Sequence, residues 1–556
     1  MTRRGGTLRY AGRGDVDHLD TVCANYTASA VVERAYARQL VSHRSTDDGT
    51  VELVADLAEQ LPTRERGDVS GDGRSYTFTL RDGACWNTPE PRQVSAYDMA
   101  RGLRRLGNPV ARCPLLSYYT DTIEGMRAYC EGFARVPGRV DALAEYLEGA
   151  ELPGIEALDE RTLVIRLLHP TPDFLDMMTL PFASAAPAEY LRHLPASADF
   201  DAHLLSDGPY VPVRHVPGEQ LVLERNPAWR QDSDPVRGQY VDRITVTLGL
   251  SQREASRRVD EGTADALWDV APELESTETS AVRVSAANGE LNPCLLINTM
   301  SPNEAGATGR LLVRQALQYA VDKRAVASVY GDPLPGTLAT QLLPPGNPAH
   351  TPFDLYPTPG FRGDPDRARR LLAEAGYPDG LTLRMIHRDA GHHPAVAEAV
   401  RTGLARAGIT VLLQAVGQAE FYAGYLDVAD RARQGVWDIT TQGWLPDWQG
   451  NNARSYLQPH FDSSDLTADD ATWGVCYGFY RSAETNRLIR SATTAEDHAT
   501  ADAYYRQADR RIMADAAVVP IMYQDSATLH SRRVRGFTSF PNYLGDPTRI
   551  WLEAEA

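Results

Sequence analysis

The chain has 556 residues, of which 43% are hydrophobic and 23% charged, and its formal net charge is −18. This is the composition of an ordinary globular protein, but the chain is too long for a single hydrophobic core. The acidic charge argues against a nucleic-acid-binding surface, which needs clustered cations, and no apolar stretch approaches the ~18 residues that span a bilayer.

Short strand-like runs alternate with amphipathic helical segments, a pattern that predicts an α/β fold. The predicted strands are residues 76–80, 162–167, 220–223, 244–248 and 381–385. Apolar residues three and four apart predict helices at 312–320 and 368–375. Asp364 and Pro365 are a typical start for the second helix, and Gly376 is a typical end. Stretches rich in proline, glycine and aspartate predict surface loops at 63–74, 344–364 and 447–470.

The chain contains six cysteines: Cys23, Cys85, Cys113, Cys130, Cys294 and Cys476. None belongs to a Cys-x-x-Cys pair or has histidine neighbours at zinc-ligand spacing, so no metal site is expected from them. An even number fits disulfides in an oxidising compartment, but buried free thiols fit equally well. If disulfides form, Cys113–Cys130 is the favoured pair, because both residues flank one short helical segment.

Catalytic motifs are missing from the sequence. It has no Gly-x-Ser-x-Gly elbow, no His-Glu-x-x-His pair, no phosphate-binding glycine loop and no Gly-x-Gly-x-x-Gly run after a strand. Residues 68–73 begin like a calcium loop, but Thr79 stands where a bidentate carboxylate is required, which favours a hairpin turn. A triad of distant residues stays open. We expect no catalytic residue, no metal and no cofactor, and a protein that is not an enzyme.

The first ten residues bear on localisation. They run directly into a strand-like segment, without the charged and apolar regions of a signal peptide. Two alternatives remain open: a cytoplasmic protein that starts at Met1, or a secreted protein whose leader is absent from this chain.

Collinear motifs cover nearly the whole chain. They are Gly-Gly-Thr-Leu-Arg at 5–9, Asp-Gly-Arg-Ser-Tyr-Thr-Phe-Thr-Leu-Arg-Asp-Gly at 72–83, Asp-Gly-Pro-Tyr at 207–210, Leu-Glu-Arg-Asn-Pro at 223–227, Val-Arg-Gln-Ala-Leu at 313–317, Gly-Trp-Leu-Pro-Asp at 443–447 and Val-Pro-Ile-Met-Tyr at 519–523. Together they resemble the family 5 extracellular solute-binding proteins, the oligopeptide- and dipeptide-binding partners of ABC importers. Segment 89–98 departs from the family pattern, because it lacks the usual glycine.

The resemblance implies a two-lobe, periplasmic-binding-protein-like clamp of the class II, peptide-binding type. Lobe I is expected to combine residues 1–45, 205–290 and 510–556, with an inserted subdomain at 46–204. Lobe II is expected to span residues 291–509. Clamps of this kind close around a ligand by a hinge motion.

The resemblance also implies how a peptide is held. An extended peptide offers backbone donors and acceptors whatever its sequence, and its fixed charge is the α-ammonium. Asp447 matches the family's aspartate that holds this ammonium, four residues after Gly443. Trp444 is expected to wall the adjacent pocket. The alternatives are a loop-capping aspartate and a core tryptophan.

A looser alignment adds six more ligand-binding candidates. Asn25, Tyr26 and Thr27 are expected to pair with the ligand backbone from lobe I. The pocket-lining candidates of lobe II are Phe421, His393 and Tyr523, for which plain packing is the alternative.

The leading hypothesis is an extracytoplasmic substrate-binding protein of an ABC importer, which binds oligopeptides or peptide-like small molecules between two lobes. The expected partners are this ligand and the permease subunits, without nucleic acid, and the chain is expected to be a monomer. The expected location is the cell surface, through a lipid anchor absent from this chain, or the medium. One alternative is a binding protein or enzyme of an antibiotic biosynthetic pathway, because the arginine-rich, lysine-poor composition resembles that of actinomycetes, whose clavulanic acid cluster contains such relatives. Another is a receptor subunit that signals the presence of peptide.

Overall fold

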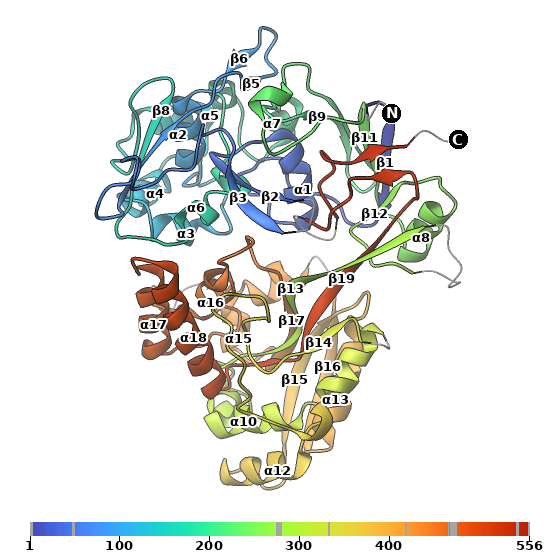
Figure 1. Ribbon diagram of the computed structural model, residues 1–556. Coiled ribbons are helices and arrows are strands. Elements are labelled where there is room, and N and C mark those ends of the chain that lie inside the picture. Colours follow the sequence, from blue (N-terminus) through green and yellow to red (C-terminus); the bar gives the residue numbers. More distant parts are fainter. Residues whose placement is uncertain are drawn as a thin grey trace. The chain divides into compact units, whose positions relative to one another are not determined.

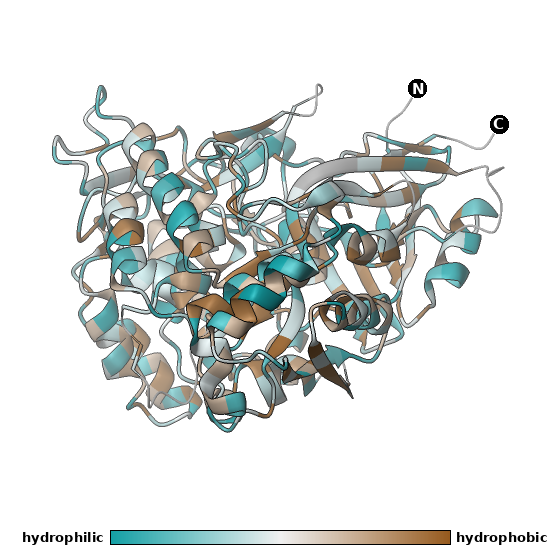
Figure 2. Cartoon of the chain, turned by 90° about the horizontal axis from the view of Figure 1, so that it is seen from below, coloured by the Kyte–Doolittle hydropathy of each residue, from teal (hydrophilic) through white to brown (hydrophobic). Residues whose placement is uncertain are grey.

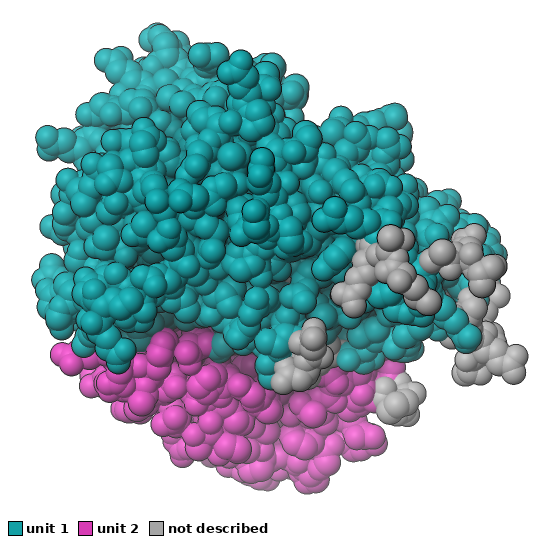
Figure 3. Space-filling model, turned by 45° about the horizontal axis from the view of Figure 1, so that its top comes forward, with its two compact units in different colours: residues 1–286, 448–450, 526–556 teal, residues 287–447, 451–525 magenta. Residues whose placement is uncertain are grey.

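The computed structural model describes residues 4–46, 50–273, 281–331, 334–417, 420–464, 466–467, 475–540 and 544–553. The chain forms two compact units (Figure 3): unit 1 comprises residues 1–286, 448–450 and 526–556, and unit 2 comprises residues 287–447 and 451–525. The chain enters unit 2 within strand β13 (Val282–Ile297) and leaves it within strand β19 (Met522–His530). The sequence predicts these boundaries at 290/291 and 509/510. The second lies later because the end of helix α18 (His498–Ala514) and residues 516–523 bury apolar side chains in the core of unit 2.

Unit 1 contains strands of a mixed sheet, labelled on the right of Figure 1. Strand β1 (Thr7–Gly12) lies parallel to β11 (Arg243–Thr247) and β12 (Ala266–Trp268). Strand β10 (Gln220–Arg225) is antiparallel to β11 and to β9 (Tyr210–Val216). Helices α1 (Thr27–Tyr36) and α8 (Gln252–Asp260) contribute buried apolar residues to the clusters that include these strands.

The rest of unit 1 has smaller sheets and short helices. Its strands are β2 (Val41–Ser45) with β3 (Val51–Ala55), β5 (Cys85–Trp86) with β6 (Arg92–Gln93), β20 (Val534–Arg535) with β21 (Trp551–Leu552), and β7 (Ile155–Ala157) with β8 (Thr162–Arg166) and β4 (Ser75–Thr79). Its helices are α2 (Ala96–Arg105), α3 (Leu116–Thr120), α4 (Met126–Phe133), α5 (Val140–Gly149), α6 (Phe174–Met177) and α7 (Ala198–Ala202). Most of this region shares one hydrophobic cluster, which also contains Trp448. The inserted subdomain at 46–204 stays a prediction.

The two ends of the sequence meet in unit 1. Arg34, on α1, donates through Nε to Oδ2 of Asp546 over 2.7 Å, and both side chains are buried. The two residues are 512 positions apart in the sequence. The C-terminal segment is therefore an integral part of unit 1.

A buried network of four charged side chains links distant segments of unit 1. Asp56 accepts from Arg38 Nε at 2.9 Å and from Arg237 Nη1 at 2.7 Å, one on each carboxylate oxygen. Asp234 lies 3.5 Å from both guanidinium groups. Burial alone raises the pKa of Asp234, but Arg38 and Arg237 hold it well below its ordinary value. The four side chains have no exposed surface, so each charge depends on the others.

The sheet of unit 2 contains a parallel βαβ crossover. Strand β15 (Leu381–Arg388) is parallel to β16 (Ile409–Val416), to which α13 (His393–Ala405) connects it, and to β17 (Ile439–Trp444). Strand β13 is antiparallel to β17 and to β18 (Val518–Pro520), and β14 (Gly336–Leu338) pairs with β19. The helices besides α13 and α18 are α9 (Asn303–Gly306), α10 (Leu311–Ala320), α11 (Lys323–Ala327), α12 (Pro365–Glu374), the π-helix η7 (Phe421–Leu426), α15 (Ala429–Arg433), α16 (Ala453–Phe461) and α17 (Ala483–Thr493).

The α/β class and the predicted elements are confirmed. The five predicted strands are β4, β8, β10, β11 and β15, and the predicted helices are α10 and α12. Asp364 caps α12, since its carboxylate accepts from the Arg367 backbone N–H at 3.0 Å. The helices carry both hydrophilic and hydrophobic residues (Figure 2), as amphipathic helices do. Within the described part of the chain, no helix is long and apolar enough to cross a membrane.

All six cysteines are free thiols in the structure, so the favoured Cys113–Cys130 pair is wrong. Burial raises the pKa of the Cys113, Cys294 and Cys476 thiols to about 12 and that of Cys130 to about 11. Since the thiolate is the reactive form, these cysteines are poor nucleophiles in the folded protein.

Unfolding should therefore expose six titratable thiols. We expect a thiol reagent to count six equivalents in denaturant without any reductant, but to react slowly with the native chain, because burial disfavours the thiolate. The measurement is a colorimetric thiol titration under both conditions. A count of four in denaturant would reveal one disulfide.

Candidate functional site

The carboxyl ends of three parallel strands define one edge of the sheet in unit 2. Strands β15, β16 and β17 run in the same direction, so Arg388, Val416 and Trp444 end at this edge. Strand β13 runs the opposite way and brings Leu291 opposite Trp444, which places Glu290 at the same edge. In open α/β sheets, ligands bind outside the carboxyl ends of parallel strands. We call this region the carboxyl edge of unit 2.

Asp447 lies at this edge, three residues beyond the end of β17. It is partly exposed, and it is the last residue of unit 2 before the chain contributes residues 448–450 to unit 1. The contact of Asp447 with an α-ammonium stays a prediction.

Gly443 is required by the close approach of a side chain. A Cβ atom at this position would lie 2.7 Å from Cγ of Asn292. Asn292 in turn donates through Nδ2 to Glu290 Oε1 at 3.0 Å and to Gln524 Oε1 at 2.8 Å. Gly443 thus makes room for a hydrogen-bonded group that holds Glu290.

Trp444 borders a small cavity within unit 2. Its indole N–H donates to the Ser455 carbonyl at 2.9 Å, and its ring packs edge-on against His460 with 3.7 Å between centroids. The cavity measures about 30 Å³ and is also lined by Tyr456 and Tyr477. This volume holds a water molecule or a small chemical group. Trp444 is therefore both packed and part of a pocket wall.

Burial and the negative charges of two carboxylates raise the pKa of the Tyr456 hydroxyl. Burial raises the pKa of Tyr456, and the negative charges of Glu290 and Asp447 raise it further, so both acids lie within electrostatic reach. The hydroxyl donates to the Gly289 carbonyl. Burial also raises the pKa of Glu290 to about 7, against the hydrogen bond from Asn292 and the charge of Arg388. The carboxyl edge thus carries two acids in different environments.

Arg388 supplies a cation at the same edge. Its guanidinium carbon lies 5.2 Å from the ring centroid of Phe421 and 5.8 Å from that of Tyr422. His393, the first residue of α13, is partly buried. Burial and the nearby charges of Arg388 and other histidines lower the pKa of His393 to about 3, so this imidazole is neutral in ordinary buffers.

Phe421 and Tyr523 pack inside unit 2. Phe421 is fully buried in a hydrophobic cluster that includes Trp437 and residues of strands β13, β15 and β16. The hydroxyl of Tyr523 donates to the carbonyls of Gln341 and Leu343 at 2.7 and 3.1 Å. The structure gives both residues a packing role, and a ligand contact for either stays a prediction.

The predicted contribution of unit 1 lies just before α1. Asp17 fixes this turn, since its carboxylate accepts from the backbone N–H groups of Asn25 at 2.8 Å and Tyr26 at 3.3 Å. Tyr26 is 60% exposed, Asn25 is exposed and Thr27 is partly exposed. These residues are accessible, and their pairing with a ligand backbone stays a prediction.

Three residues of the carboxyl edge are missing from the sequence prediction: Glu290, Arg388 and Tyr456. Arg388 had a signal, because it follows a predicted strand at the end where ligands bind. Glu290 directly precedes the predicted crossing between lobes. Tyr456 had none, since it lies in a stretch predicted as a loop.

Known proteins resemble this chain over most of its length. Residues 52–468 match the family model for bacterial extracellular solute-binding proteins, family 5. The periplasmic oligopeptide-binding protein OppA of Salmonella typhimurium is 25% identical over 480 residues, which cover 84% of this chain and 80% of OppA. The probable deoxycholate-binding periplasmic protein YgiS of Escherichia coli is 26% identical over 497 residues, or 88% of this chain and 84% of YgiS.

A solved structure extends the match to the fold. The clavulanic acid biosynthesis oligopeptide binding protein 2 superposes with a TM-score of 0.84 at 27% identity, covering 100% of this chain and 96% of that one. The family match spans well over half of the chain, in agreement with the motifs and the α/β architecture. The chain therefore belongs to the bacterial extracellular solute-binding proteins, family 5.

Proposed function

We propose that the chain binds oligopeptides or peptide-like molecules as the substrate-binding subunit of an ABC importer, and that it releases them unchanged. The carboxyl edge of unit 2 carries this proposal, because the charges of Glu290 and Asp447 both act on Tyr456, which also lines the small aromatic cavity. An α-ammonium taken out of water needs such an anion. The similarity to an oligopeptide-binding protein supports the same ligand class.

The proposed roles follow from the charges at this edge. Asp447 holds the ligand α-ammonium, and Glu290 adds a second negative charge near it. Arg388 offers a cation to an acidic group of the ligand. Asn25, Tyr26 and Thr27 of unit 1 pair with the ligand backbone, with side chains taking the place of the Asn25 and Tyr26 backbone N–H groups that Asp17 already holds.

Peptides should stabilise the protein without being consumed. We expect the melting temperature to rise with peptide concentration, because a ligand that binds only the folded state stabilises it by mass action. A thermal-shift screen of short peptides measures this, with deoxycholate as a second ligand class. Mass spectrometry of the recovered peptide checks for turnover, and cleaved or modified product would contradict the proposal.

Glu290 should make peptide binding pH-dependent. Because its pKa is about 7, the carboxyl is largely protonated below that pH and charged above it. A ligand ammonium favours the charged form, so affinity for a free-amine peptide should rise as the pH rises through about 7. In Glu290→Gln this rise should disappear. Calorimetry at each pH gives the ratio of wild-type affinity to variant affinity. Titration of the peptide itself affects both proteins equally and therefore cancels in this ratio. A ratio that does not change with pH would exclude the role of Glu290.

A second candidate is a binding protein or enzyme in antibiotic biosynthesis. The observation that favours it is the similarity to a clavulanic acid biosynthesis oligopeptide binding protein. Deletion of the gene separates the two: loss of peptide uptake supports the importer, and loss of a secondary metabolite with normal uptake supports the alternative.

The family is extracellular. The importer proposal adds specific partners, an oligomeric state and a location. It includes contact with permease subunits, a monomeric state, and attachment through a lipid anchor or release into the medium. Light scattering of the purified chain tests the monomer, and cell fractionation tests the location.

A further inference from the structure

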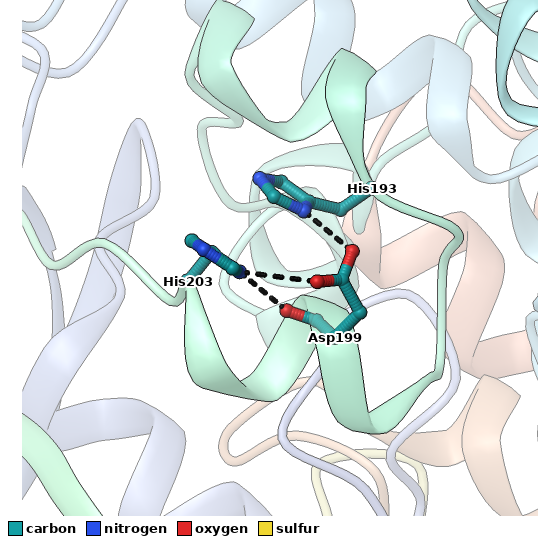
Figure 4. A group of neighbouring side chains, drawn as sticks. All are labelled: His193, Asp199 and His203. Atoms are coloured by element: carbon teal, nitrogen blue, oxygen red, sulfur yellow. Dashed lines mark hydrogen bonds and ion pairs between the residues drawn. The ribbon is translucent and has the colours of Figure 1, made fainter.

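Two histidines and an aspartate meet in unit 1, outside the proposed peptide site (Figure 4). His193 follows the short helix η2 (Ala188–Arg192), Asp199 lies in α7, and His203 directly follows α7. One imidazole nitrogen of each histidine and one carboxylate oxygen of Asp199 all lie within 4.8 Å of one another. Among the described residues, no other group of three histidines, cysteines or acids meets that criterion.

The donor atoms already point at one another. His193 Nδ1 lies 2.7 Å from Asp199 Oδ2, and His203 Nδ1 lies 3.4 Å from Oδ1 of the same carboxylate. His203 Nδ1 is also 2.8 Å from the Asp199 carbonyl oxygen. Figure 4 shows both imidazoles directed toward the aspartate. A cation that replaces the two Nδ1 protons would meet two nitrogens and a carboxylate.

A packed base holds the backbone that presents these ligands. Ser197 caps α7 by accepting from the Phe200 N–H at 3.2 Å, and Phe200 is buried against Tyr190 of η2, with 4.6 Å between ring centroids. The Arg105 guanidinium lies over both rings, at 5.4 and 5.2 Å. The segments on either side of the cluster are thus fixed to each other.

The side chains themselves remain free to adjust. The side chains of Asp199 and His203 are 61% and 54% exposed, and that of His193 is 16% exposed. The two imidazole rings are stacked, with centroids 4.1 Å apart and an angle of 15° between planes. An ion bound in the plane of both rings requires them to open apart, and the exposed His203 ring has room to rotate.

We propose that His193, Asp199 and His203 bind a divalent transition-metal ion of the Zn²⁺, Cu²⁺ or Ni²⁺ class, with water at the remaining positions. Imidazole is a good ligand for these ions, and a carboxylate neutralises part of their charge. Ca²⁺ and Mg²⁺ prefer all-oxygen sites and are not expected to bind. The sequence predicts no metal site, because the three ligands lie six and four residues apart and match no standard motif. The bound ion would link η2 to α7, and the site is independent of the proposed peptide function.

Calorimetric titration of the full chain with ZnCl₂ tests the proposal. We expect one binding site, at least tenfold weaker binding in His203→Ala, and no site in His193→Ala/His203→Ala. His498→Ala replaces an exposed histidine at the start of α18 and should bind like the wild type. CaCl₂ should give no binding heat. Zinc should also raise the melting temperature of the wild type but not of the double variant.

The cysteines require a separate control, because thiolates also bind zinc. Co²⁺ in place of zinc should give only weak visible bands, without the intense charge-transfer absorption of thiolate ligands. Circular dichroism of the variants in EDTA verifies that they fold, and His203→Ala is the safer of the two because its side chain is exposed. Zinc binding of wild-type strength in the double variant, or no binding to the wild type, would overturn the proposal.

Discussion

Asp447→Asn is expected to weaken the binding of peptides with a free amino terminus by about 3–5 kcal/mol, the typical effect of breaking one side of a buried ion pair. At about 1.4 kcal/mol per tenfold, this is a loss of roughly two to three and a half orders of magnitude in affinity. Asparagine keeps the size of the side chain but cannot neutralise the ligand ammonium. Calorimetry with one tripeptide in both proteins measures the change.

An N-acetylated form of the same peptide is the ligand control. It carries no ammonium, so its affinity should hardly differ between wild type and Asp447→Asn. The four affinities close a double-mutant cycle, and a coupling energy near zero would show that the amino terminus is held elsewhere. Asp430→Asn makes the same chemical change at an exposed ion pair of unit 2 and should leave binding unaltered.

Asp56→Asn should destabilise unit 1 by about 3–5 kcal/mol, because it removes one member of a fully buried charge network. The substituted amide can accept from one guanidinium but presents N–H donors to the other, so one cation loses its partner. Asp234 alone then faces both Arg38 and Arg237. Urea unfolding followed by tryptophan fluorescence measures the loss.

The control for this effect is a surface pair. Asp141→Asn breaks the ion pair between Asp141 and Arg139, whose side chains are 75% and 70% exposed, respectively. This substitution should leave the midpoint of urea unfolding unchanged. Equal midpoints for Asp56→Asn and wild type would mean that the buried charges do not stabilise unit 1.

Elements with strong local signals could be predicted from the sequence. Alternating apolar residues predict β11 and β15, and Asp364 with Pro365 predicts the start of α12, because each signal acts within a few residues of where it is read. Helix α16 lies in a stretch that the sequence predicts as a loop, since aspartate, asparagine and serine are frequent around it. Its Pro459 lies in the last turn, and burial of Tyr456, Leu457 and Phe461 stabilises the helix through packing that no local pattern reveals.

The residues of the candidate site also fall into those that the sequence predicts and those that it does not. Asp447 and Trp444 could be proposed because the motif at 443–447 is continuous in sequence. For Glu290 and Arg388 the sequence gives only their positions beside a predicted crossing and a predicted strand, because a charged residue in a sequence looks the same whether it faces solvent or a second charge brought to it by the fold. The four charges of the Asp56 network likewise lie in three separate segments and only meet in the folded unit.

The ion pair between Arg34 and Asp546 affects the order in which the two units can fold during synthesis. A ribosome that adds about 5–20 residues per second needs roughly 25–100 s between these two side chains. During that interval all of residues 287–525 emerge, so unit 2 has its complete sequence before unit 1 does. Until residues 526–556 are synthesised, the Arg34 guanidinium lacks its partner Asp546 and unit 1 is incomplete. Unit 2 is thus in a position to fold first, although it is encoded in the middle of the chain.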